Sequence, residues 1–283
     1  MDALEPRSSL TAGWRGRLAL GLERRGARTI IARREHVGPL VVQRPFHPEA
    51  DGACHVYVLH PPGGVVGGDE LELVIDVASA ASALVTTPAA TKLYRSAGAT
   101  ALVRNRLRVR ATGVLEWLPQ ETIAFGGADA RVSTDVALEP GAVFLGWEIS
   151  CLGRPASGDE FASGRLDQRF TLELAGRPVL ADRLLTEGGG ALQRSCFGWG
   201  GRTVYGCFVA VGAPPGLTGA LRDAIRTPDA ADLFAVTNVA EACVCRFLGS
   251  SAARARAVLA RAWAVAREVS LGKAACSPRI WVT

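Results

Sequence analysis

The sequence predicts a mainly β protein with a layered helical β-architecture, similar to a β-solenoid, and two α-helices packed alongside in the C-terminal half. Three observations indicate this fold class. Apolar and polar residues alternate with period two in many short segments, as in half-buried strands. One turn-strand-turn pattern occurs three times in the first half of the chain. Apolar residues recur at helical spacing only late in the sequence.

The alternating segments define the expected strands. Glu70–Val77 is the clearest of them, because its leucines, isoleucine and final valine share one face. Ala101–Val109 follows the same rule, with arginines at 104, 106 and 108 on the solvent face. Further expected strands include residues 17–20, 29–31, 38–42, 55–59, 170–174, 204–211 and 242–248.

The repeated pattern covers residues 80–86, 113–119 and 141–147. Each copy places a small residue at a turn, then a short apolar strand, then a polar turn. Stacked coils of a helical β-structure produce such a repeat, because every coil must present the same turn and the same inward face. An ordinary β-meander is the alternative explanation.

Two helices are expected in the second half. The first runs from Leu217 to Arg226, after two prolines and before Pro228. The second runs from about Ser250 to Leu271, where Ser250 or Ser251 can cap its start and Gly272 can end it. We expect its apolar stripe at positions 258, 259, 262, 263, 266 and 269, and its arginines 254, 256, 261 and 267 on the other faces.

Composition limits the class of protein. Of 283 residues, 48% are hydrophobic and 21% charged, which excludes general disorder and predicts one domain over residues 1–283. Residues 1–35 contain eight arginines instead of a secretory signal, and no run of 18 apolar residues occurs. The seven cysteines are an odd number. We therefore expect a cytoplasmic protein with reduced thiols, most of them small buried hydrophobes, and no membrane contact.

Positive charge is concentrated near the end of the chain. The net charge is +5, and seven basic residues lie between Arg246 and Arg279 with only Glu268 against them. We expect Arg254, Arg256 and Arg261 to form a docking face for a protein partner, and a solvated helix face is the alternative. No nucleic-acid motif accompanies this charge.

The most unusual segment is the glycine-rich loop from His60 to Asp69, with the sequence HPPGGVVGGD. A phosphate-binding loop would end in Gly-Lys-Ser or Gly-Lys-Thr before a helix, whereas this loop ends in an acid before a strand. His60 and Asp69 provide an imidazole and a carboxylate, which a divalent metal such as nickel accepts. A turn held by hydrogen bonds is the alternative.

A second polar segment, residues 86–96, combines Thr86 and Thr87 with Lys92. Threonine–lysine catalysis is conceivable for this combination, and a polar turn is the simpler explanation. Cys243 and Cys245 lie two residues apart in an expected strand and therefore share a face. No second cysteine or histidine pair is near them in the sequence, so we expect a packing role instead of a metal site.

Acidic residues form the third group. Glu116 and Glu121 lie in residues 115–122, and Glu148 follows the third copy of the repeat. Paired carboxylates indicate either a cation path or a glycan hydrolase built on a β-solenoid. All four histidines lie within residues 36–60, which leaves no later histidine for a hydrolase triad.

Several of these segments together resemble one family. They are the His60–Asp69 loop, TTPAATK with YRS at 86–96, EWLPQET at 116–122, GWE at 146–148, LGRPA at 152–156, GPLVVQRPF at 38–46 and PRIW at 278–281. In this order they closely resemble the urease accessory protein UreD family, called UreH in some systems. One departure is Ala80, where the family usually has glycine in a turn.

The resemblance implies a helical β-fold with a pair of helices alongside, and a function without catalysis. UreD-like proteins are scaffolds that bind urease apoprotein and a UreF-type helical partner, which recruits the nickel-carrying UreG-type GTPase. Nickel is thought to reach the urease active site through a water-filled tunnel inside the UreD-like subunit. The ion is then transient cargo, and no tightly bound cofactor is expected.

Such a passage needs polar and sparse ligands, because a closed four-ligand site would trap the ion. A nickel-storage protein would need more clustered histidines. The candidates to line the passage come from the best-matched segments and are His60, Asp69, Thr86, Thr87, Glu116, Glu121 and Glu148.

Overall fold

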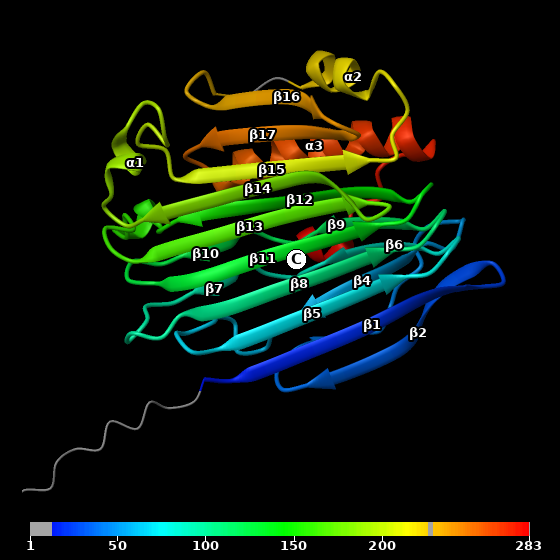
Figure 1. The fold of residues 1–283 in the computed structure, drawn as a ribbon, viewed down its shortest axis with the longest axis horizontal. Helices are drawn as coiled ribbons and strands as arrows, with labels where there is room; N and C mark the ends of the chain where they lie inside the picture. Colours follow the sequence, from blue (N-terminus) through cyan, green and yellow to red (C-terminus); the bar gives the residue numbers. More distant parts are fainter. Residues whose placement is uncertain (1–12, 226–228, 283) are drawn as a thin grey trace, which may run out of the picture.

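The computed structural model describes residues 13–225 and 229–282 and contains two β-sheets that lie face to face (Figure 1). The first sheet faces the viewer in Figure 1 and has the strand order β14-β13-β11-β8-β5-β1-β2. Its strands are β1 (Arg15–Arg25), β2 (Arg28–Val37), β5 (Glu70–Val77), β8 (Ala101–Val109), β11 (Asp129–Leu138), β13 (Arg165–Leu174) and β14 (Arg177–Glu187).

The second sheet lies behind the first and has the order β16-β17-β15-β12-β9-β6-β4-β3. Its strands are β3 (Val41–Val42), β4 (Cys54–Leu59), β6 (Ser82–Thr86), β9 (Val114–Leu118), β12 (Val143–Leu152), β15 (Val204–Val211), β16 (Leu233–Val239) and β17 (Ala242–Gly249). Two short strands, β7 (Thr91–Leu93) and β10 (Thr122–Ala124), pair with each other, and β10 also pairs with β12.

From β4 to β13 the chain alternates between the two sheets and so winds into successive coils. Within each sheet the coiled strands are parallel: β4, β6, β9 and β12 in one, and β5, β8, β11 and β13 in the other. Antiparallel strands follow at the end of the stack, where β14 pairs with β13 and β15 with β12. The predicted fold class, a helical β-architecture similar to a β-solenoid, is confirmed.

The three repeated segments are neighbouring coils. Ser82 pairs with Val114, and Val114 pairs with Val143. This register places Ala80, Thr112 and Gly141 at equivalent turns, and all three have positive φ, at 59°, 59° and 78°. Sequence analysis aligned Gly113 with Ala80 in the repeated pattern. This alignment was wrong by one residue in the second copy, because the left-handed turn residue there is Thr112.

Three α-helices occur in the described residues: α1 (Ala191–Arg194), α2 (Leu217–Ala224) and α3 (Ala252–Leu271). Two short 3-10 helices span Pro155–Ser157 and Arg279–Val282. The expected helix ends Arg226 and Pro228 lie outside the described residues. Sequence analysis missed α1, a single turn without apolar periodicity. No helix of the described chain is long and apolar enough to cross a membrane.

Helix α3 begins and ends as the sequence predicts. The Ser251 hydroxyl accepts a hydrogen bond from the Arg254 amide, and Gly272 ends the helix in a left-handed conformation. Two side chains do not lie where we expected them. Val269 is exposed, whereas Arg267 is fully buried. The buried face therefore continues from Ala266 to Arg267, whose charge is balanced by carboxylates.

Two apolar cores result from this arrangement. One lies between the sheets and contains inward residues such as Leu73, Leu115 and Phe144. The other lies between the outer face of the second sheet and helices α2 and α3, and it contains Leu145, Trp147 and Trp263. Because alternate residues of a strand point to opposite faces, strands β6, β9, β12, β15 and β17 of the second sheet contribute to both cores. Each face of this sheet also carries a buried carboxylate, Glu148 on the inner face and Glu116 on the outer face.

Candidate functional site

A cavity of about 160 Å³ lies between the two sheets, and several polar side chains interrupt its mainly apolar wall. Leu71, Leu73 and Trp117 form part of its apolar wall. Its polar lining includes His60, Thr87, Asn105, Gln120, Glu148 and Gln168. A space of this volume can hold several water molecules, and its polar side chains provide the partners that such water needs.

Glu148 is the carboxylate of this cavity. It lies on β12 and faces the first sheet, and its carboxylate accepts hydrogen bonds from the Thr134 hydroxyl and from Gln168 Nε2, the latter at 2.7 Å. Asn105 Nδ2 in turn donates to the Thr134 hydroxyl at 3.0 Å. Burial raises the pKa of Glu148, and the charge of Asp182 raises it further, while the two hydrogen bonds act in the opposite direction. Glu148 therefore holds its proton to a higher pH than an exposed glutamate does.

A smaller cavity of about 20 Å³ continues beyond Glu148 and Gln168, which line both spaces. Its other polar residues are Asp182, Tyr205 and Cys207. The Tyr205 hydroxyl donates to Asp182 at 3.0 Å, and Arg246 pairs with the same carboxylate at 3.2 Å. The volume is enough for about one water molecule. Polar groups thus extend from the larger cavity, past Glu148, to the half-exposed Asp182.

His60 and Thr87 lie at the opposite, outer part of the larger cavity, beside the exposed Ala89. Partial burial lowers the pKa of His60, and the nearby charge of Asp69 opposes that shift. The imidazole therefore loses its proton more readily than that of an exposed histidine, and its neutral form can act as a weak ligand. Lys92 and Arg104 also line this cavity, so a cation finds its negative partner only further inside, at Glu148.

Asp69 and Thr86 lie outside the cavity lining and hold the backbone. The Asp69 carboxylate accepts hydrogen bonds from the amides of Trp14 and Val66, which closes the glycine-rich loop. The Thr86 hydroxyl donates to the carbonyl of Leu118 at 2.6 Å and accepts from Trp281 Nε1 at 3.0 Å. Asp69 fits the hydrogen-bonded turn that sequence analysis offered as the alternative, whereas Thr86 is the last residue of strand β6 and not part of a turn.

Glu116 faces the second core, against α3. It accepts hydrogen bonds from Trp263 Nε1 at 2.5 Å and from Arg267 Nε at 3.2 Å. Burial raises the pKa of Glu116, and the charge of Arg267 lowers it. Glu121 is bonded by Arg256 at 2.9 Å. Of the seven passage candidates, the structure therefore brings His60, Thr87 and Glu148 to one cavity and leaves the other four elsewhere.

The register also separates the carboxylates on which the hydrolase alternative depends. Glu116 pairs with Leu145, not with Glu148, and it points to the opposite face of the second sheet. Glycoside hydrolysis needs two carboxyl groups within roughly 10 Å across one substrate site. A sheet lies between Glu116 and Glu148, so this pair does not form such a site.

The docking candidates on α3 differ in their contacts. Arg254 pairs with Asp232 at 2.7 Å and with Asp229 at 3.2 Å. Arg256 pairs with Glu121. Arg261 lies exposed on the helix surface. The first two arginines connect α3 to the rest of the chain, so Arg261 is the member most accessible to a partner.

Sequence analysis missed Asn105, Thr134 and Gln168, the polar partners of Glu148. Each occupies an inward position of a strand whose other inward residues are mostly apolar. Period-two alternation could have marked them as polar residues on a buried face. Their proximity to Glu148 depended on the register of four strands, which one sequence does not reveal.

The fold and cavity define a class of protein: a two-sheet helical β-protein with a buried carboxylate in an inner cavity and helices against one outer face. Comparison with known proteins identifies its family. The sequence model of the UreD urease accessory protein family matches residues 15–282. The chain therefore belongs to the UreD family of urease accessory proteins, which gives it a role in urease maturation.

The chain aligns with individual members of this family over nearly the full length of both sequences. The chain is 43% identical over 282 residues to the urease accessory protein UreD of Alkalilimnicola ehrlichii, covering 100% of this chain and 96% of the relative. It is 41% identical to UreD 2 of Brucella anthropi, covering 97% and 100% respectively. It is 43% identical to UreD of Pseudomonas putida, covering 96% and 95%. The resemblance inferred from the motifs is confirmed.

Proposed function

We propose that this chain, acting as one domain over residues 1–283, is a non-catalytic scaffold that conducts nickel to the urease active site through its interior. The observation that carries this proposal is the buried carboxylate of Glu148, which lines both cavities between the sheets together with Gln168. Apolar packing would stabilise the space between two sheets better than a buried acid does. A polar interior at that position fits the passage of a hydrated ion.

The proposed passage begins near His60 and Thr87, passes Glu148 and Gln168, and continues toward Asp182. Ligands along it are single and weak, which permits release as well as binding. A divalent ion reaching Glu148 displaces the proton that burial retains there, so the occupancy of this position by nickel increases with pH. The ion is cargo that leaves again.

Partners follow from the family. We propose that the chain binds urease apoprotein and a UreF-type protein, and through the latter a UreG-type GTPase, in the cytoplasm. The exposed Arg261, together with the flanking Arg254 and Arg256, is the proposed docking face on α3. All seven cysteines lie in the described residues as free thiols.

The proposal is tested by Glu148→Leu in the complex with urease apoprotein. We expect the variant to bind the apoprotein as before, because Glu148 lies inside the chain. Activation by nickel should slow by roughly 10–100-fold, the usual effect of losing a residue that supports a metal ion. Glu173→Leu, on the exposed outer face of β13, is the control and should activate normally. Normal activation by a stably bound Glu148→Leu variant would refute the proposed passage.

A further inference from the structure

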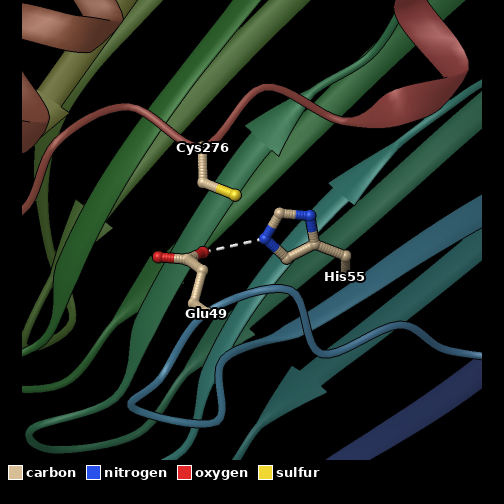
Figure 2. A group of neighbouring side chains, drawn as sticks. All are labelled: Glu49, His55 and Cys276. Carbon is tan, nitrogen blue, oxygen red and sulfur yellow. Dashed lines mark hydrogen bonds and ion pairs between the residues drawn. The ribbon is translucent and has the colours of Figure 1, made fainter.

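A second polar cluster lies on the other face of the second sheet and involves Glu49, His55 and Cys276 (Figure 2). Their ligand atoms, one carboxylate oxygen, one imidazole nitrogen and one thiol sulfur, all lie within 4.8 Å of one another. His55 Nε2 lies 2.8 Å from Glu49 Oε1. The three residues come from the segment before β4, from β4 itself and from the segment after α3.

The cluster is buried and incompletely paired. The His55 side chain has no exposed surface, and that of Glu49 is 10% exposed. Within the described residues, His55 Nδ1 is a buried atom without a hydrogen-bond partner. Arg267 pairs with both Glu49 and Glu116, so one guanidinium is shared between two carboxyl groups. Buried polar groups left in this state are uncommon in proteins.

We propose that Glu49, His55 and Cys276 bind one first-row divalent cation of borderline softness, such as Zn²⁺. Imidazole, thiolate and carboxylate are the ligands that such ions select. In a tetrahedral site the sulfur and nitrogen ligands lie about 3.6 Å apart, so the thiol needs to approach by no more than about 1 Å, while Glu49 and His55, now 2.8 Å apart, separate slightly. Three protein ligands leave the fourth position open, which permits exchange of the ion.

Binding of a cation at this site would change the protonation and the charge of the cluster. The Cys276 thiol must lose its proton to bind, and burial together with Glu49 raises its pKa, so a cation would release that proton to solvent. His55 must bind through Nε2 without a proton, so the proton of the neutral ring would move to Nδ1. Two carboxylates, one thiolate, one guanidinium and one divalent cation then sum to zero charge.

The cluster lies just beneath the surface, where Cys276 is partly exposed and His55 is fully buried. A surface depression of about 210 Å³ is lined by His47, Pro48, His55, Tyr57 and Ser277. It reaches His55 itself and the residue following Cys276. An ion can therefore arrive from solvent without passing the cavity of Glu148, which lies on the opposite face of the second sheet. This site is independent of the proposed nickel passage.

The test uses the purified full chain alone, with Co²⁺ as the probe, because thiolate–cobalt bonds give a near-ultraviolet charge-transfer band. We expect the band to appear on titration and to be absent in Cys276→Ser. The affinity of this variant for Co²⁺ should fall by more than the roughly 10–100-fold that loss of an outer-shell partner costs. Cys196→Ser is the matched control, because Cys196 is exposed and lies in another loop.

The proposal is overturned if wild-type protein gives no band, or if the band persists in folded Cys276→Ser. Alkylation of wild-type protein provides a measurement that needs no variant. Saturating Zn²⁺ should slow modification of Cys276, mapped by mass spectrometry, and leave Cys196 unchanged. Equal rates at Cys276 with and without Zn²⁺ would also overturn it. Neither experiment contains urease. A negative result would therefore reject the Glu49–His55–Cys276 site without bearing on the proposed nickel passage.

Discussion

Replacing the buried Arg267 by methionine should destabilise the protein severely. Arg267 is fully buried, and its guanidinium donates to Glu116, to Glu49 and to the carbonyl of Ala274. It also lies over the ring of Trp263, 5.6 Å from the centroid. Methionine retains much of the apolar stem and removes the charge. Two carboxylates then lose the cation that they share.

The magnitude follows from the cost of an uncompensated buried charge. Removing one partner of a buried ion pair costs about 3–5 kcal/mol. For a chain of this size each kcal/mol lowers the melting temperature by roughly 2–4 °C, so Arg267→Met should melt about 6–20 °C below wild type. The double variant Arg267→Met/Glu116→Gln should recover part of this loss, because one of the two orphaned charges is then absent.

Thermal unfolding followed by circular dichroism measures both variants. Arg261→Met is the control, since this exposed arginine lies on the same helix and its replacement should change stability by no more than about 0.5 kcal/mol. The reasoning is refuted if Arg267→Met melts with the Arg261→Met control. It is also refuted if the double variant is no more stable than Arg267→Met.

Two further predictions concern stability. Ala80→Gly should stabilise the protein by about 0.5–1 kcal/mol. Glycine relieves the left-handed backbone strain at φ 59°, and this gain exceeds the extra conformational entropy that glycine gives the unfolded chain. A lower melting temperature would contradict this. Hydrogen bonds from Arg183 and Arg169 lower the pKa of Asp167, so its contribution to stability is complete above the ordinary value of 3.8 and is lost as pH falls below it. Unfolding between pH 2 and 5 should therefore show a weaker acid dependence in Asp167→Asn, and an unchanged dependence would disprove the assignment.

The fold was largely predictable because its signals are local. Alternation within Glu70–Val77 identifies a strand whatever its neighbours are, and repeated turns at residues 80, 112 and 141 reflect the same requirement in every coil. The candidate site was less predictable because it depends on register. A shift of one residue moves a side chain to the opposite face of a strand, and this difference separates Glu148 in the cavity from Glu116 against α3.

The second polar cluster was beyond sequence reasoning for a related reason. Glu49 and Arg267 are 218 positions apart in the chain, and they meet only because α3 packs on the outer face of the second sheet. Helical periodicity assigned Arg267 to a solvent face, since an arginine is rarely buried without a partner. The partners became visible only in three dimensions.

The central claim is that nickel passes between the two sheets, and a reversible plug tests it most directly. Thr87→Cys places a thiol on the cavity wall at its outer part, and a small methanethiosulfonate reagent can add a bulky group there. Wild-type protein treated in the same way controls for the native cysteines. We predict that modification of the variant slows urease activation by nickel and that reduction with dithiothreitol restores it. An unchanged activation rate at complete modification of residue 87 would contradict the account.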